Sequence, residues 1–417
     1  MSERPLGRTP RMTREAVLED DARGSPREVF RAFLKLGVTS FGGPIAHLGY
    51  FRDELVVRRR WIDEAGYADL VALCQFLPGP ASSQVGFALG LLRAGALGAL
   101  AAWTAFTLPS ALVLLAFAFG ATAFQGPTGA GLIHGLKVVA VAVVAQAVWG
   151  MARTLCPDRA RASIAVAAVL TVIFVGGSFG QIGAIVLGAA AGLWLCRGIP
   201  ASTVGHLSFP VSRAAGAACL AIFGLLLLFL PFAAAALDLQ GLALLDSFYR
   251  AGALVFGGGH VVLPLLQAEV VQPGWVTTDA FLAGYGAAQA VPGPLFTFAA
   301  YLGAVVGPEP NGVAGAIIAL IGVFLPGLLL VVGALPFWDA LRLRPLAQAA
   351  MRGANAAVVG ILGAALYHPV WTSAILSPHQ FSLALVGFVL LTIWTAPPWV
   401  VVALTAAGGA GLAMWSQ

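Results

Sequence analysis

Apolar residues fill most of this chain in long, nearly unbroken runs that are separated by short polar stretches. Runs of about 20 apolar residues predict α-helices that cross a lipid bilayer, because each helix satisfies its own backbone hydrogen bonds there. The sequence therefore predicts an all-α, polytopic membrane protein. The expected segments are approximately 29–50, 66–92, 95–124, 131–152, 162–178, 182–196, 214–236, 248–267, 280–303, 313–337, 352–367, 380–395 and 399–415.

The second half of the sequence repeats the first, including two kinds of break inside apolar segments. The repeated breaks are Phe41-Gly42-Gly43-Pro44 with Phe256-Gly257-Gly258-Gly259, and Pro78-Gly79-Pro80 with Pro292-Gly293-Pro294. Six segments repeat as six, and the remaining segment, 214–236, inverts the second half relative to the first. This is the inverted-topology repeat of many secondary transporters, here with broken or re-entrant helices.

The distribution of basic residues is consistent with this inversion. Loop 51–65 carries four Arg residues, whereas its counterpart in the repeat, 268–279, carries no Lys or Arg. Basic loops stay on the cytoplasmic side, so the two loops are expected on opposite sides. The expected organisation is a disordered cytoplasmic tail over 1–28, a first transport repeat over 29–200, a linking transmembrane span over 201–240 and a second, inverted transport repeat over 241–417.

Composition excludes several functional classes. Only 10% of residues are charged and 59% are hydrophobic, and 22 of the charged residues fall in the first 64 positions. Too few basic residues remain to follow a nucleic-acid backbone. The four Cys and six His residues show no metal-ligand spacing, and no nucleotide or flavin motif is present. We therefore expect no metal, no cofactor, no nucleic-acid partner and no enzymatic activity.

The breaks provide candidate chemistry. A Pro-Gly-Pro sequence ends one half-helix and starts another, whose free N–H groups and dipole favour an anion. Two kinds of break, each present in both halves, predict a substrate site at the midplane, although glycine and proline also mark ordinary kinks and close packing. The candidate substrate-binding residues are Gly42, Gly43, Pro44, His47, Gln75, Pro78, Gly79, Pro80, Ser82, Ser83, Gln84, Gly257, Gly258, Gly259, His260, Gln289, Pro292, Gly293, Pro294 and Thr297.

Polar residues within the apolar segments are further candidates, because each is costly in hydrocarbon. Lys35 and its counterpart Arg250 either attract the anion or extend to the interface, and Lys137 and its counterpart Asn355 are assigned to gating. Asp69 either couples transport to protons or pairs with an Arg of the cluster 58–60. The two Gln candidates either line the site or cap broken backbone. The two His candidates either titrate or only pack.

Residues 28–416 resemble the chromate ion transporter family in its long, two-domain form. The resemblance rests on Phe-Gly-Gly in both halves, on Gln-x-x-Pro-Gly-Pro in both halves, and on Trp61 and Trp275. It implies chromate export across a bacterial plasma membrane, chromate resistance, and sulfate as a related ligand. We expect a cytoplasmic N-terminus and a flux driven by the membrane potential or an ion gradient. A sulfate or general oxyanion transporter, an anion channel and a homodimeric state remain open.

Inversion of the two halves predicts a topology that labelling can test. Single Cys residues placed in 51–65 and in 268–279 should react with a membrane-impermeant thiol reagent from opposite sides of the membrane, as basic residues in only one of the two loops require. Labelling is measured in intact cells and in inside-out vesicles. Reaction of both positions from the same side would refute the inversion.

Overall fold

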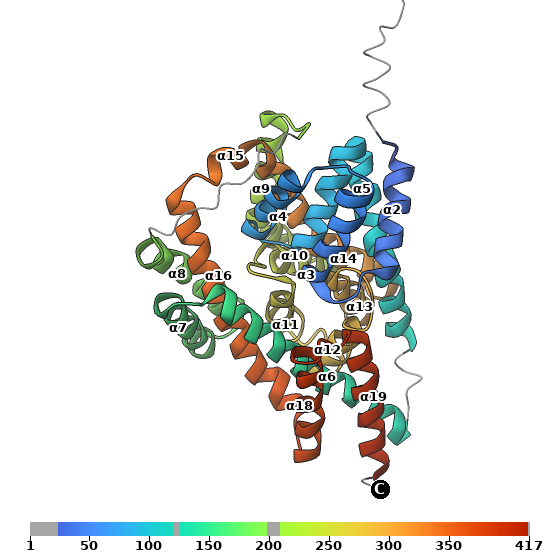
Figure 1. Ribbon diagram of the computed structural model, residues 1–417. Helices are drawn as coiled ribbons and strands as arrows, with labels where there is room; N and C mark the ends of the chain where they lie inside the picture. Colours follow the sequence, from blue (N-terminus) through green and yellow to red (C-terminus); the bar gives the residue numbers. More distant parts are fainter. Residues whose placement is uncertain (1–23, 121–125, 198–208, 416–417) are drawn as a thin grey trace, which may run out of the picture.

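The computed structural model describes residues 24–120, 126–197 and 209–415, and every element in these ranges is helical (Figure 1). The elements of the first half are α2 (Pro26–Thr39), α3 (Gly43–Phe51), η1 (Arg52–Arg58), α4 (Glu64–Phe76), α5 (Ala81–Gly120), α6 (Gly126–Leu155), α7 (Arg159–Val175) and α8 (Gly177–Leu195). The long helix α9 (Arg213–Leu237) follows.

The second half begins after α9. Its elements are α10 (Gln240–Ala253), η3 (Gly259–Val261), α11 (Val262–Val270), α12 (Thr278–Ala288), η4 (Leu295–Thr297), α13 (Phe298–Val305), α14 (Gly312–Ala334), η5 (Leu335–Phe337), α15 (Trp338–Leu341), α16 (Pro345–Ala365), η6 (Leu366–Trp371), α17 (Thr372–Ala374), α18 (Pro378–Thr392) and α19 (Pro398–Trp415).

Seven helices in the described ranges are long and apolar enough to cross a membrane. The prediction of an all-α polytopic membrane protein is confirmed. The number is lower than that of the expected segments in part because several segments consist of two short helices on either side of a break. In addition, α5 contains two segments, since its chain reverses at Ala94 and Gly95, where Gly95 has a φ of +63°.

The two halves interlock through their last helices. Helix α6 packs against α19 and α18 of the second half, and α16 packs against α8 and α7 of the first half. Small residues let these backbones approach closely. A Cβ atom added at Gly135 would lie 2.3 Å from the Thr405 oxygen, and one added at Gly353 would lie 2.0 Å from the Gly188 oxygen. Equivalent positions of the two halves thus make equivalent contacts, whereas their inverted orientation in the membrane stays a prediction.

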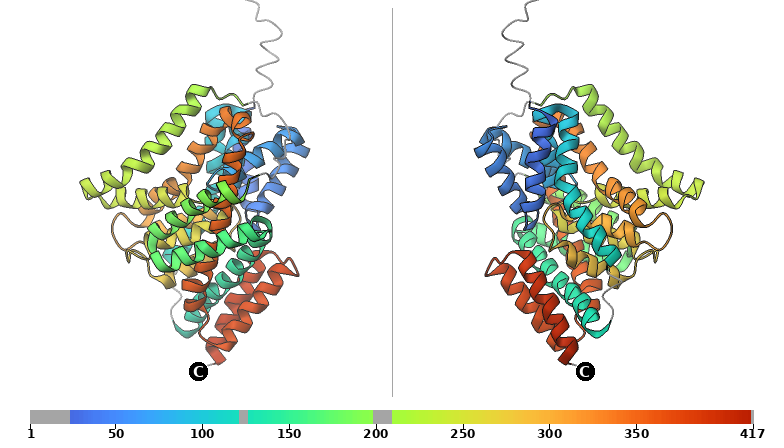
Figure 2. Two further views of the ribbon diagram at one scale, coloured as in Figure 1. Left: turned by 90° about the vertical axis from the view of Figure 1, so that its left-hand side faces the viewer. Right: turned by 90° about the vertical axis from the view of Figure 1, so that its right-hand side faces the viewer.

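Helix α9, the expected linking span, runs along the outside of the molecule (Figure 2). Only 6% of its most apolar 18-residue stretch is buried. The Tyr249 hydroxyl of α10 donates a hydrogen bond to the Phe223 carbonyl of α9 at 3.0 Å and so attaches α9 to the second half. The connection between the halves therefore lies at the periphery and leaves the interior to the interlocked helices.

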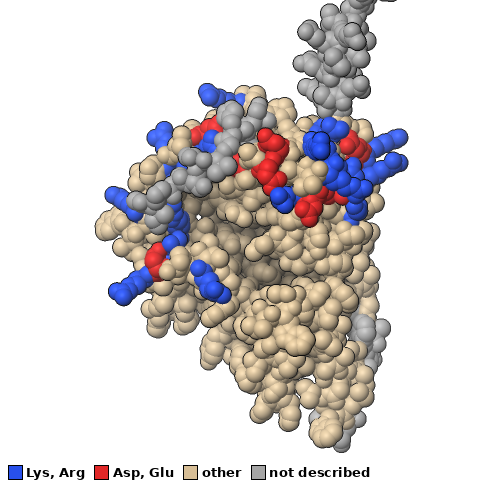
Figure 3. Space-filling model, in the orientation of Figure 1, with Lys and Arg blue, Asp and Glu red and all other residues tan. Residues whose placement is uncertain are grey.

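Charged side chains collect at one end of the molecule. In Figure 3 they lie around the start of α2, around α15 and, at the left edge, in the region of α7 and α8, whereas the lower part of the same face carries none. This end also holds a buried ion pair between the halves. Arg342 donates to both carboxylate oxygens of Asp69 at 3.0 Å, and the Trp338 indole donates to the same carboxylate at 2.9 Å. The expected alternative, that Asp69 pairs with an Arg of the cluster 58–60, is wrong. The Arg that pairs with Asp69 is Arg342, which comes from the opposite half.

Candidate functional site

The two Pro-Gly-Pro turns are held by the opposite half of the molecule. The Gly79 N–H donates to the Val255 carbonyl at 2.7 Å, and the Gly293 N–H donates to the Ser40 carbonyl at 2.8 Å. Val255 and Ser40 occupy equivalent positions, each directly before a Phe-Gly-Gly break. Each turn therefore bonds the break of the other half, and this satisfies backbone groups that a continuous helix would have bonded internally.

Both Phe-Gly-Gly breaks have positive φ angles at their first two glycines. Gly42 and Gly43 have φ values of +99° and +79°, and their counterparts Gly257 and Gly258 have values of +74° and +145°. Residues with a side chain rarely adopt such values. Helix α3 starts directly after the first break, and η3 followed by α11 starts after the second. The sharp turns thus create new helix starts within apolar segments.

A cavity of about 400 Å³ lies where these breaks converge. The first half contributes Phe41, Gly42, Gly43 and Tyr50, together with Val143 and Gln146 of α6. The second half contributes His260, Ala288, Gln289, Val291, Gly293, Leu295 and Leu391, and the turn from Thr395 to Pro398. Five predicted residues are thereby brought together at one cavity: Gly42, Gly43, His260, Gln289 and Gly293.

The polar groups of this cavity are neutral. None of the described residues that line it is Lys, Arg, Asp or Glu. The Gln289 side-chain nitrogen is buried and has no hydrogen-bond partner among the described residues. His260 has one ring nitrogen engaged, because Nδ1 lies 2.7 Å from the Tyr285 hydroxyl. The cavity therefore offers neutral donors and ends of helices to a ligand.

The other predicted polar residues near the breaks bond within the protein. His47 Nδ1 lies 3.3 Å from the Ser82 hydroxyl, and Gln84 donates to the carbonyls of Pro78 at 3.0 Å and Gly327 at 2.9 Å. The Thr297 hydroxyl donates to the Pro294 carbonyl at 2.7 Å. These contacts fix the turns. None of the residues that make them lines the cavity.

Several further predicted residues lie outside the cavity lining. The Ser83 hydroxyl is buried and has no partner among the described residues, whereas Gln75, the counterpart of Gln289, is exposed. Pro44 packs near Gly259, because a Cβ atom added at Gly259 would lie 3.1 Å from its ring. The two Phe-Gly-Gly breaks are therefore close neighbours. Pro80 and Pro292 do not line the cavity.

Lys35 and Arg250 each bind a glutamate at the same sequence separation. Lys35 pairs with Glu54 at 2.8 Å, and Arg250 pairs with Glu269 at 2.7 Å. Burial by itself would raise the pKa of Glu54, but hydrogen bonds from Lys35 and Arg59 outweigh it and hold the pKa at about 2. Glu54 lies in η1, outside the apolar segments, and stays ionised at neutral pH. Both predicted cations are thus neutralised by carboxylates outside the cavity lining.

The predicted gating pair occupies two different environments. Lys137 of α6 pairs with Asp279 of α12 at 2.9 Å, which links the two halves. Asn355 of α16 has a buried side-chain oxygen with no partner among the described residues, and it lies near Gly257. Asp69, the predicted proton-coupling residue, is held by Arg342 and Trp338 and does not line the cavity.

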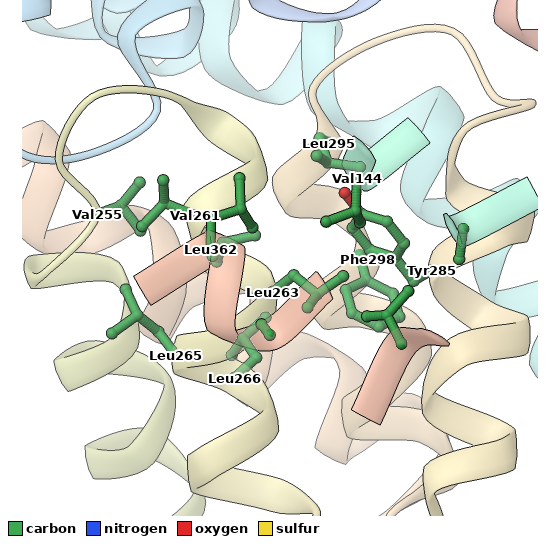
Figure 4. Close-up of a cluster of buried hydrophobic side chains, with 14 of the residues drawn as sticks. Val144, Val255, Val261, Leu263, Leu265, Leu266, Tyr285, Leu295, Phe298 and Leu362 are labelled. Carbon is green, nitrogen blue, oxygen red and sulfur yellow. The ribbon is translucent and has the colours of Figure 1, made fainter. Parts of the chain in front are cut away.

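Sequence reasoning missed several contributors to the cavity. Tyr50, Gln146 and the turn from Thr395 to Pro398 line it, and Tyr285 supports it from behind. Figure 4 shows Tyr285 beside Phe298 in the buried cluster that also contains Leu295 and Val144. A polar Gln within the apolar helix α6 and the Thr-Ala-Pro-Pro turn were signals in the sequence. Tyr285 gave none, because its role depends on the partner that folding brings to it.

Comparison with known proteins shows that both halves of the chain match the same protein family. The sequence profile of the family described as Chromate transporter matches residues 27–193 and 242–412. The chromate transport protein of Pseudomonas aeruginosa is 29% identical over 92% of this chain and 91% of its own length. The probable chromate transport protein of Synechococcus elongatus is 28% identical over 94% and 96%, respectively. No solved structure shows a significant match.

The turn geometry predicts the effect of a side chain at either turn glycine. Gly79→Leu and Gly293→Leu should each abolish transport without preventing membrane insertion, because φ is +122° and +92° there. The added Cβ atoms would also lie 3.0 Å from the Gly327 Cα and 3.1 Å from the Phe106 oxygen, respectively. Transport is measured in vesicles and insertion in the membrane fraction. Gly363→Leu is the control, since a Cβ atom there meets nothing within 4 Å. Normal transport by either turn variant would contradict this assignment.

Proposed function

This chain belongs to the chromate transporter family, and we propose that it exports chromate across the bacterial plasma membrane as a secondary transporter. Export would lower the cytoplasmic concentration of the toxic oxyanion and confer resistance. The proposal includes a cytoplasmic N-terminus, since the end of the molecule where α2 begins carries the charged side chains (Figure 3).

The observation that carries this proposal is the uncharged cavity between the breaks of the two halves. Chromate is a tetrahedral dianion and needs hydrogen-bond donors in place of its water shell. Neutral donors and helix starts hold such an anion without a permanent counter-charge, so that release on the other side is not opposed by a strong ion pair. Sulfate has the same shape and charge, and we expect it to compete for the same donors.

We propose alternating access as the mechanism. The two halves rock about the cavity, while the hydrogen bonds of Gly79 and Gly293 keep each turn on the opposite break. An inside-negative potential favours export of a dianion by about 4.6 kcal/mol per 100 mV, which corresponds to roughly three decades of concentration ratio. We propose that Asp69 has a structural role rather than a proton-coupling one, because Arg342 and Trp338 hold its carboxylate.

Inside-out vesicles test the direction and the driving force together. A lumen-positive potential at equal pH on both sides should drive chromate uptake, and excess sulfate should reduce it. A strict requirement for a pH gradient would replace potential-driven export with proton coupling. Flux that is directed only toward the cytoplasm would instead identify an oxyanion importer. Vesicles without the protein give the background.

The two repeated glutamines provide a matched pair for testing the cavity. Gln289→Leu should raise the chromate KM by about ten-fold, since one hydrogen bond to a charged ligand contributes roughly 1.5–3 kcal/mol. Gln75→Leu should leave the KM within about two-fold, because this side chain is exposed away from the cavity. Both are measured as initial rates of vesicle uptake. Equal effects of the two substitutions would rule out the cavity as the binding site.

A further inference from the structure

Tyr285 differs from the other buried tyrosines in what its hydroxyl contacts. The hydroxyls of the other three donate to backbone carbonyls, in the pairs Tyr67 with Leu48, Tyr249 with Phe223 and Tyr301 with Ala280. Tyr285 is fully buried, and its hydroxyl lies 2.7 Å from the Nδ1 atom of His260. No carbonyl among the described residues accepts a bond from it. The imidazole is therefore the partner of this phenol.

The surroundings determine which group donates the proton. A buried phenol that made no donor bond would leave its proton unsatisfied, at a cost of about 1–3 kcal/mol. Among the described residues, the one hydrogen-bond partner of the Tyr285 hydroxyl is Nδ1 of His260, and we infer that the phenol donates to it. A neutral imidazole that accepts at one nitrogen carries its proton on the other. His260 is consequently an Nε2–H donor, and no described residue accepts a hydrogen bond from this nitrogen.

We propose that Tyr285 is a positioning residue that holds His260 with its proton on Nε2, so that His260 donates a hydrogen bond to the oxyanion in the cavity. The inference rests on the proposed transport function, since it names a donor of the same site. His260 lines the cavity together with Gln289, whose side-chain nitrogen is buried and without a partner. The opposite tautomer would present a lone pair to the anion and repel it.

The arrangement belongs to the second half alone. In the repeat alignment, Ile45 occupies the position of His260 and Val71 occupies that of Tyr285. Ile45 is largely exposed, and Gln75, the counterpart of Gln289, is exposed as well. At these equivalent positions the first half therefore contributes only the backbone of Gly42 and Gly43 to the cavity, whereas the second half contributes the side chains of His260 and Gln289; the polar side chains that the first half adds, Tyr50 and Gln146, come from elsewhere in it.

Transport kinetics of Tyr285→Phe test this inference. The substitution keeps the aromatic ring in the buried cluster and removes only the hydroxyl, so both tautomers of His260 become accessible. The chromate KM should rise by about two-fold where the two tautomers are equally populated, and further where the Nδ1–H form predominates, at an unchanged maximal rate, because only the Nε2–H form donates to the ligand. The control is Tyr301→Phe, which removes a buried hydroxyl bonded to a backbone carbonyl, and its KM should not change. A KM of Tyr285→Phe equal to wild type would overturn the proposal.

A second readout is independent of transport. Solid-state NMR of the full chain with ¹⁵N-labelled histidine distinguishes the two neutral tautomers, and His260→Gln identifies the signal among the six His residues. We expect the Nε2–H form in wild type and a mixture in Tyr285→Phe. A wild-type signal from the Nδ1–H form would refute the inference even if chromate is transported. If only sulfate is transported, the KM comparison is made with sulfate, and the proposed substrate fails while the tautomer assignment stands.

Discussion

Backbone N–H and C=O groups that are not bonded within a helix must find a partner inside the protein, because the surrounding lipid offers none. This constraint determines how the broken backbone is hydrogen-bonded at the centre of the molecule. Each Pro-Gly-Pro turn has lost its helical bonds, and its glycine N–H is bonded to a carbonyl that precedes the Phe-Gly-Gly break of the other half, from Gly79 to Val255 and from Gly293 to Ser40. Neither half satisfies its own breaks in this way. The interlocking of α6 with α19 and of α16 with α8 keeps the two halves in the register that these bonds require.

The same constraint explains how the proposed anion site is built with so little charge. Breaking a helix exposes N–H groups, and folding two broken segments against each other places helix starts around one cavity. The two predicted cations beside the Phe-Gly-Gly breaks are paired with carboxylates, Lys35 with Glu54 and Arg250 with Glu269. These ion pairs connect helices within each half. Neutral N–H groups at the cavity are thus available to an anion, whereas the charged side chains stabilise the packing of the helices.

Much of the fold could be predicted from the sequence, because apolar length and glycine or proline breaks act locally on the backbone. The all-α membrane architecture follows from the length of the apolar runs, and the positions of the broken helices follow from the glycine and proline breaks. Side-chain partners could not be predicted in the same way. Asp69 pairs with Arg342, far away in sequence, and nothing near Asp69 indicates this. Gln75 and Gln289 precede identical Pro-Gly-Pro turns, yet one is exposed and the other borders the cavity. Their difference arises from the helices packed around them.

The contrast between these glutamines has a consequence for transport. A scaffold whose halves make equivalent contacts can exchange their roles, so that the cavity opens alternately to either side. If His260 and Gln289 supply side-chain donors, the anion stays bonded to the second half while the two halves rock about the cavity. The Gly43 backbone leaves room for the anion, because a Cβ atom there would meet nothing within 4 Å. The equivalent contacts between the halves then allow the cavity to open to either side of the membrane, and the unequal side chains determine to which half the ligand stays bonded.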